Sequence, residues 1–61
     1  MKTLIDYISG AKYKNVEILQ NADDLPRDSY FVTSLLDNKS MERFAIYKDS
    51  NNFYYAISED D

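Results

Sequence analysis

Large apolar residues recur at every second position in three stretches of the second half of the chain. The stretches are "YFVTSLL" (residues 30–36), "MERFAIYK" (41–48) and "FYYAIS" (53–58). A period of two is typical of strands with one buried face. The segments between them, "DNKS" and "DSNN", favour tight turns, because Asp, Asn and Ser side chains hydrogen-bond to the nearby backbone. Connections this short predict a meander of three antiparallel strands.

The first ten residues show apolar positions at helical spacing instead. Leu4 and Ile8 would lie on one helix face by the i, i+4 rule. Thr3 suits the N-cap of a helix, and Gly10 suits the left-handed position just past its end. Residues 3–10 are therefore predicted to form a short helix. Since two helical turns are not stable alone in water, we expect this helix to pack against the sheet.

The middle of the chain supplies one more strand and a loop. Residues 13–20 are predicted to form a strand, because Val, Ile and Tyr favour extended backbone. Residues 21–29 are predicted to form a loop with one tight helical turn, which Pro26 would end. We expect the acidic residues 59–61 to be frayed. The predicted architecture is a single α+β domain over residues 1–61, with a short N-terminal helix packed on a small antiparallel sheet.

The predicted turns assign the side chains of the meander to two faces. Four-residue turns would pair Leu36 with Met41 and Lys48 with Phe53, and side chains then alternate between the faces. The face with the larger apolar side chains is the expected core. Its members are Phe31, Thr33, Leu35, Phe44, Ile46, Phe53, Tyr55 and Ile57.

The same pairing places Tyr30, Tyr47 and Tyr54 in a row across the opposite face. Tyrosine combines a large, rigid contact area with a hydroxyl group that tolerates water, and interfaces are enriched in it. The row is therefore a candidate partner-binding surface. The alternative is structural, since aromatic cross-strand pairs also stabilise a sheet. A shift of register by one residue would remove the row.

The composition excludes most catalytic and metal chemistry. The 61 residues include no cysteine, no histidine and one glycine, so disulfides, zinc thiolate sites, the common nucleophile–base pairs and glycine-rich phosphate loops cannot form. "DSNNFYYAISE" begins like a calcium-binding loop, but Phe53 stands at a ligand position and Tyr54 stands where glycine is required. We expect no catalytic activity, no cofactor and no metal site. A chain this short has marginal stability unless a partner or a second copy supplements it.

The charge is acidic and unevenly placed. Eleven Asp and Glu against seven Lys and Arg give a formal net charge of −4. The basic residues are scattered, which opposes direct binding of nucleic acid. Asp23, Asp24 and Asp28 cluster in the central loop and would steer the domain toward a basic protein surface. Mimicry of a nucleic-acid backbone and simple solubility are both compatible with this cluster.

The sequence favours a protein that acts through its surface. No apolar run spans a membrane and no signal peptide is evident, so we expect a cytoplasmic protein that does not bind membranes. The leading hypothesis is a stoichiometric protein-binding module that inhibits or modulates a larger protein with a basic surface. Nucleic-acid-handling and defence proteins fit as partners, a profile typical of phage and mobile-element proteins. The alternative is a structural role, in which the tyrosine face forms a homodimer or assembly interface.

Overall fold

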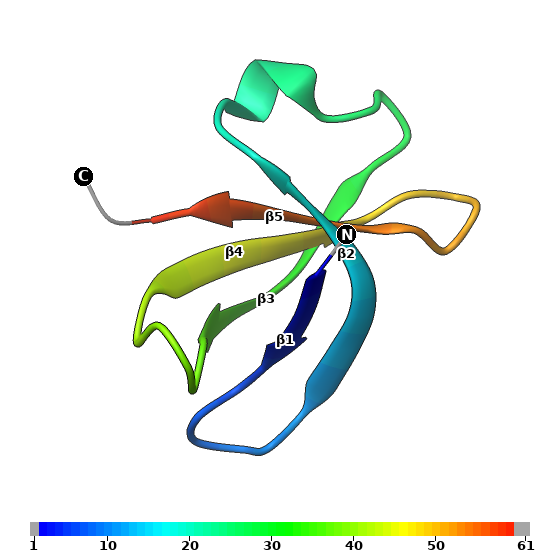
Figure 1. Cartoon of the computed structure of the whole chain (residues 1–61). Helices are drawn as coiled ribbons and strands as arrows, with labels where there is room; N and C mark the ends of the chain where they lie inside the picture. Colours follow the sequence, from blue (N-terminus) through cyan, green and yellow to red (C-terminus); the bar gives the residue numbers. More distant parts are fainter. Residues whose placement is uncertain (1, 60–61) are drawn as a thin grey trace.

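A computed structural model describes residues 2–59, and these form one five-stranded sheet of order β1-β2-β5-β4-β3 (Figure 1). The elements are β1 (Lys2–Ile5), β2 (Lys12–Leu19), a 3₁₀ turn (Ala22–Asp24), β3 (Tyr30–Leu36), β4 (Arg43–Lys48) and β5 (Tyr54–Ser58). Neighbouring strands are antiparallel except β2 and β5, which run parallel. The chain therefore leaves β2, crosses to the far edge of the sheet, and returns through a meander that pairs its last strand with β2.

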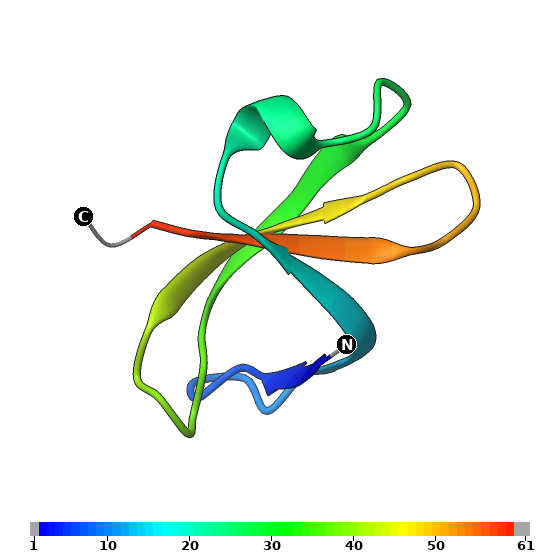
Figure 2. The same cartoon turned by 45° about the horizontal axis from the view of Figure 1, so that its top comes forward.

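The two edge strands meet at one end of the sheet. Asp6 and Asp37, which follow β1 and β3, form an antiparallel bridge. Beside it, the backbone N–H of Tyr7 donates to the carbonyl oxygen of Leu36 at 2.7 Å. The sheet thus curls into a partly closed barrel, with the 7–10 and 37–42 turns at the closed end (Figure 2). Curling gives a sheet of this size an inside that its own strands cover.

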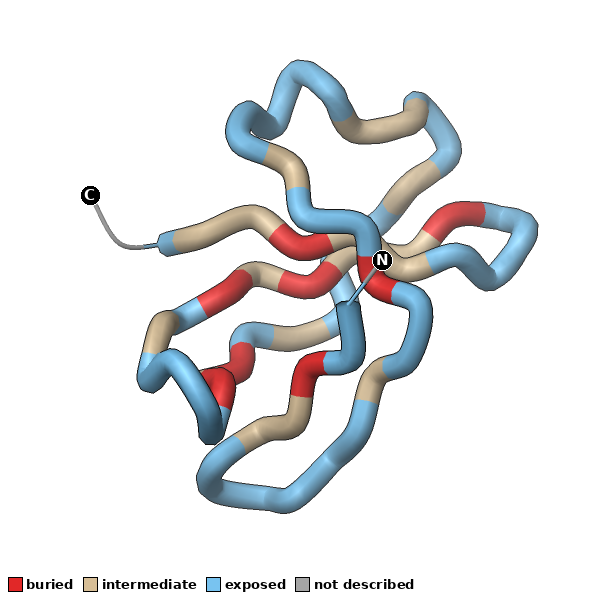
Figure 3. Tube along the Cα trace, in the orientation of Figure 1, coloured by how far each residue is buried: buried red, intermediate tan, exposed pale blue. Residues whose placement is uncertain are grey.

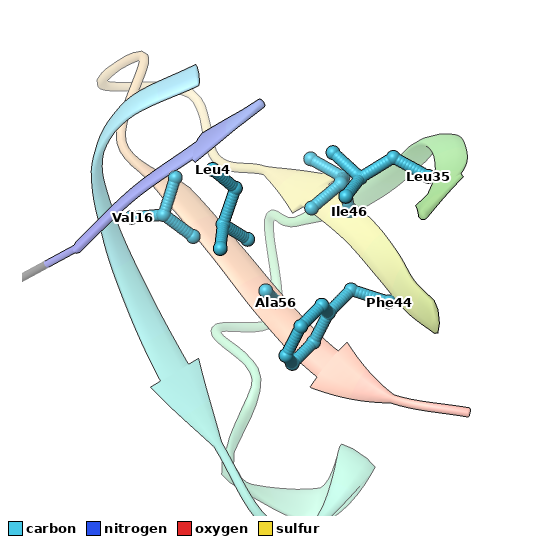
Figure 4. Packing of buried hydrophobic residues seen from close by; sticks show 6 residues of the cluster. All are labelled: Leu4, Val16, Leu35, Phe44, Ile46 and Ala56. Atoms are coloured by element: carbon cyan, nitrogen blue, oxygen red, sulfur yellow. The ribbon is translucent and has the colours of Figure 1, made fainter. Parts of the chain in front are cut away.

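Every strand contributes to the core inside the curl. The buried hydrophobic residues are Leu4, Val16, Leu35, Phe44, Ile46 and Ala56 (Figure 4). They lie on the strands, and most loop residues are exposed (Figure 3). Tyr13 and Tyr54 are partly buried and pack against this cluster. Because the core draws on all five strands, burial of apolar surface depends on the whole sheet being formed.

The predicted N-terminal helix is wrong, and with it the α+β class: the domain is nearly all β. The predicted antiparallel sheet is also wrong, because β2 and β5 run parallel and the sheet is mixed. Lys2–Ile5 is a strand that pairs with β2, and residues 7–10 form the turn between them. The carboxylate of Asp6 accepts hydrogen bonds from the Ser9 hydroxyl at 2.6 Å and the Ser9 N–H at 3.2 Å, which closes the turn. Leu4 and Ile8, assigned to one helix face, are 2% and 84% exposed.

The pairing of β4 with β5 is shifted by one residue from the predicted pairing. Lys48 pairs with Tyr54 and not with Phe53, because the connection has five residues, 49–53. Asn52 takes a φ of 69° there, a left-handed conformation that asparagine tolerates better than most residues. The odd shift inverts the faces of β5. Consequently Ala56 is buried, and Tyr55 lies on the face opposite to the predicted one.

The pairing of β3 with β4 contains a bulge. Near the turn Leu36 pairs with Arg43, a shift of two residues from the predicted partner Met41, which preserves the faces. The register then changes between Phe31 and Thr33, so that Phe31 pairs with Tyr47. An extra residue in one strand shifts the alternation beyond it. The core prediction therefore holds for Leu35, Phe44 and Ile46 but is wrong for Phe31, which is 57% exposed.

The end of the chain is partly described. Residues 60–61 of the predicted frayed tail lie outside the described residues. Glu59 is not frayed as predicted, because hydrogen bonds join it to β4 and β3. Its N–H donates to the Arg43 carbonyl at 2.8 Å, and its carboxylate accepts the Ser34 hydroxyl at 2.9 and 3.1 Å. The last described residue is thus hydrogen-bonded to the sheet.

Two of the turns share one design. "DYISGA" (6–11) and "DNKSME" (37–42) each start with Asp and have Ser three positions later. In each turn the Ser hydroxyl and N–H donate to the Asp carboxylate, and the next residue has a positive φ. That residue is Gly10 in the first turn, with φ 76°, and Met41 in the second, with φ 58°. Methionine at this position is strained, since its Cβ crowds the following carbonyl group.

We predict that Met41→Gly raises the free energy of unfolding by about 0.5–1 kcal/mol. Relief of the left-handed strain exceeds the entropy that glycine adds to the unfolded chain. The Met41 side chain is 52% exposed, so little packing is lost. Urea denaturation of the wild type and the variant measures the change. The control Lys39→Gly lies in the same turn at an ordinary φ, and equal stabilisation by both variants would contradict the explanation.

Candidate functional site

Aromatic side chains form a row across the outer face of β3, β4 and β5. Ile46 and Ala56 are a cross-strand pair buried in the core, so the next pair along the strands, Tyr47 and Tyr55, points outward. Phe31 pairs with Tyr47 from the other side, and the two rings meet edge to face with centroids 5.7 Å apart. We call Phe31, Tyr47 and Tyr55 the outer aromatic row. It crosses three adjacent strands, and Phe31 at its end is largely exposed.

The structure separates Tyr47 from the other two tyrosines of the predicted row: Tyr30 and Tyr54 both pair with Lys48 and share its face, whereas Tyr47 lies on the opposite face. Tyr30 is 54% exposed and pairs with Lys48, while Tyr47 belongs to the outer aromatic row. Tyr54 packs against the core, with its ring edge-on to Tyr13 at 5.3 Å between centroids. The ammonium group of Lys48 lies 5.5 Å from the centroid of the Tyr54 ring, within cation–π range. Only Tyr47 therefore keeps its predicted place on an outer aromatic face.

The three predicted acidic residues divide into two groups. Asp23 and Asp24 are exposed in the 3₁₀ turn between β2 and β3. Asp28 instead joins two loops, because its carboxylate accepts the hydroxyl of Ser50 and, at 3.2 Å, the Ser50 N–H. The hydrogen bond from the Ser50 hydroxyl has the largest effect on Asp28, and with the bond from the Ser50 N–H it keeps the pKa of Asp28 below its usual value. Asp28 thus positions the β4–β5 turn against the 21–29 loop.

Asp49 organises the turn at the end of the outer aromatic row. It is only 5% exposed, and its carboxylate accepts the N–H groups of Asn51 at 2.9 Å and Phe53 at 3.0 Å. The same carboxylate accepts the phenolic hydroxyl of Tyr55 at 2.9 Å. This hydrogen bond is the main reason that the pKa of Tyr55 is raised. The Asp-, Asn- and Ser-rich turn predicted the bonds from Asp49 to the backbone, whereas nothing in the sequence indicated the bond from Tyr55.

A pocket lies beside the row, where β2 meets the start of β5. It has a volume of about 230 Å³ and is lined by Asn15, Glu17, Phe53, Tyr54 and Tyr55. Glu17 of β2 pairs with Tyr55 of β5, so the row continues from aromatic rings to a carboxylate. A second hollow of similar volume is lined by Ile8, Ser34, Leu35, Leu36 and Arg43, near the closed end of the barrel. The first pocket alone combines several aromatic rings with an acidic side chain.

The described part of the chain shows no arrangement for metal chemistry. Among residues 2–59, no group of three or more Asp and Glu side chains is placed to hold a metal ion. Nor does any helix within this range have the length and apolar character needed to cross a membrane. The features that could contact another molecule are the outer aromatic row and the adjoining pocket that contains Glu17, and hydrogen-bonded turns hold both in place.

Carboxylates in the turns make the stability of the domain depend on pH. Ser9 hydrogen bonds lower the pKa of Asp6. Burial raises the pKa of Asp37, but hydrogen bonds, chiefly from the N–H and hydroxyl of Ser40 at 3.1 and 2.9 Å, together with the charge of Lys2 lower it by more. A carboxylate whose pKa is lower in the folded than in the unfolded state stabilises the fold fully at pH values above its unfolded pKa, which is 3.8 for Asp. This stabilisation is lost as the pH falls through the pKa of the folded state.

We predict that Asp37→Asn is less stable than the wild type at pH 7 and that the difference narrows below about pH 4. In the wild type, acid protonates the Asp37 carboxylate, which then no longer accepts the Ser40 hydrogen bonds as a charged group. The variant lacks these charged hydrogen bonds at every pH. Urea denaturation at several pH values between 7 and 2 measures both curves. Asp24→Asn makes the same charge change in the exposed 3₁₀ turn and serves as control. A difference between Asp37→Asn and wild type that stays constant over the whole range would contradict the prediction.

Fold and site together define a small, curled β-sheet domain with an outward aromatic row. Comparisons with protein-family models, curated protein sequences and solved structures found no match to the chain.

Proposed function

We propose that this chain is a stoichiometric protein-binding module, which inhibits or modulates a larger protein by occupying part of its surface. The observation that supports this function is the outer aromatic row, in which Phe31 is 57% exposed although it is among the largest apolar side chains of the domain. Tyr47 and Tyr55 are half-buried, but Tyr30 and Val32 beside Phe31 are 54% and 38% exposed. Large exposed residues that lie together are typical of interaction surfaces, whereas single exposed residues are ordinary.

The size of the domain suits action by occupancy. A standard interface buries about 800 Å² on each partner. The surface of this domain is 4356 Å², so such an interface would use roughly a fifth of it. The net charge of −4 favours a partner with a basic surface, since complementary charge speeds encounter. Asp23 and Asp24, which are exposed, are suited to this steering role.

The test compares two exposed aromatic residues that lie in different parts of the sheet. Phe31 belongs to the outer aromatic row, and Tyr7, 60% exposed, lies in the turn after β1. Wild-type protein captures the partner from a lysate of its own cells, and calorimetry with the purified partner then gives the affinities. We expect Phe31→Ser to weaken binding at least about tenfold and Tyr7→Ser to leave it within about twofold. Equal effects of the two variants would contradict the proposal.

Self-association is a second candidate, because β3 is one of the two edge strands of the sheet. Its residues Tyr30, Phe31 and Val32 are 54%, 57% and 38% exposed. Edge strands with apolar side chains pair readily with other strands, including those of a second copy. Light scattering separates this candidate from the first. A wild-type dimer that Phe31→Ser converts to a monomer, with no other protein captured, would favour it.

A further inference from the structure

The pocket beside the outer aromatic row is built from parts that hydrogen bonds hold in place. Phe53 forms one wall, and both its N–H and its carbonyl oxygen bond to Asp49, at 3.0 and 3.1 Å. Tyr55 is fixed by its hydroxyl bond to the same carboxylate. The turn that carries Asp49 is in turn tied to the 21–29 loop through Asp28 and Ser50. A site whose walls are held in this way loses little entropy on binding.

Negative charge converges on the pocket. Glu17 lines it directly, and its paired neighbour is Tyr55. The carboxylates of Asp49, Glu17 and Asp28 all act electrostatically on the Tyr55 hydroxyl, each favouring its neutral form. Such a field attracts a cation, and Tyr55, which pairs with Glu17 and shares its face, adds an aromatic ring beside Phe53.

We propose that this pocket receives the guanidinium group of an arginine side chain on the partner protein. This inference rests on the proposed function and names the chemistry by which the partner is recognised at one end of the outer aromatic row. The guanidinium group donates hydrogen bonds to the Glu17 carboxylate while its plane contacts the aromatic walls. Arginine is suited to both contacts, because it is planar, weakly hydrated and always charged.

The volume and the neighbouring charges narrow the choice of ligand. A pocket of about 230 Å³ is smaller than the usual sites for small molecules and matches a single side chain. Lys48 already places its ammonium group over the Tyr54 ring, 5.5 Å from the centroid. The incoming cation is therefore expected to contact Glu17, Phe53 and Tyr55. A lysine ammonium group, being strongly hydrated, would gain less from aromatic walls.

The test uses the full chain and a short peptide, Gly-Arg-Gly with blocked ends, in an NMR titration of backbone amides. The matched peptide carries citrulline, which has the shape of arginine without its charge. We expect saturable shifts at Asn15, Glu17 and residues 53–55 with the arginine peptide and none with the citrulline peptide. Glu17→Gln is expected to weaken the binding about tenfold. Glu42→Gln makes the same charge change in the 37–42 turn and is expected to leave the affinity unchanged.

Several results would overturn the inference. They are the absence of saturable shifts, equal binding of the citrulline peptide, shifts centred elsewhere, and equal weakening by Glu17→Gln and Glu42→Gln. The spectra of both variants without peptide show whether they are folded. The affinity of Phe31→Ser and Glu17→Gln for the purified partner tests the proposed function separately. If Phe31→Ser loses binding and Glu17→Gln does not, the module stands and the arginine pocket fails; the reverse result preserves the pocket and rejects the row.

Discussion

Ile46→Ala is expected to cost the domain about 2–5 kcal/mol, which is comparable to its whole stability. Ile46 is 0% exposed and lies in the middle of β4, between the strands that supply the rest of the core. Truncation leaves a cavity that a small sheet cannot collapse to fill, in addition to the lost burial of apolar surface. In thermal unfolding followed by circular dichroism, we expect Tm to fall by at least about 10 °C, or no folded state at 25 °C.

Ile8→Ala is the matched control, since the same atoms are removed from a residue that is 84% exposed. Its free energy of unfolding should stay within about 0.5 kcal/mol of the wild type. A large loss for Ile8→Ala with little loss for Ile46→Ala would contradict the assignment of inside and outside. A large loss for Ile8→Ala is the result expected if residues 3–10 formed a helix packed through Ile8.

Asp49→Ala is expected to lower the free energy of unfolding by about 2–3 kcal/mol. The substitution leaves three donors without their acceptor: the N–H groups of Asn51 and Phe53 and the hydroxyl of Tyr55. Partly buried donors cost more to leave unbonded than the bond itself contributes, because they have already lost water. Urea denaturation measures the loss. Asp23→Ala, in the exposed 3₁₀ turn, is the control and should change stability by less than about 0.5 kcal/mol.

A double-mutant cycle isolates the bond between Asp49 and Tyr55. Tyr55→Phe removes the hydroxyl group and keeps the ring of the outer aromatic row. Once Asp49 is replaced by Ala, the hydroxyl has no carboxylate to bond, so Tyr55→Phe should cost less than it does in the wild type. Strict additivity of the two substitutions would show that the bond contributes nothing to stability.

The meander was predictable because local chemistry specifies it. Alternating apolar positions and turn residues indicated three strands at the right places, and β3 spans Tyr30–Leu36. The parallel pairing of β2 with β5 was not, since it joins segments about 40 residues apart and no local signal marks it. β2 also exposes Ile18, at 39%, and this obscures its inward face.

The first hairpin was misassigned because a two-turn helix and a tight hairpin share signals. Gly10 serves a helix end and a left-handed hairpin position equally well, and both need its positive φ of 76°. A second turn of the same chain carries the signal that favours the hairpin. Asp6 and Ser9 repeat the spacing of Asp37 and Ser40, and both pairs close turns by the same hydrogen bonds.

The sequence predicted that an aromatic row crosses the sheet, but not which residues form it. The sequence indicated an aromatic row across three strands, and one exists, but Phe31 and Tyr55 replace Tyr30 and Tyr54. Period-two patterns cannot detect a bulge or an odd turn, and either one moves every later side chain to the other face. Asn52, at a left-handed position of the 49–53 turn, was the residue that could have signalled the odd length.

Both proposals depend on this register, and ring-to-ring nuclear Overhauser effects test it most directly. The structure predicts cross-peaks between the rings of Phe31 and Tyr47, with centroids 5.7 Å apart, and between Tyr13 and Tyr54, at 5.3 Å. It also predicts that Tyr47 and Tyr54 show none, because they lie on opposite faces of the sheet. Cross-peaks joining the rings of Tyr30, Tyr47 and Tyr54 would contradict the register, the outer aromatic row and the pocket beside it.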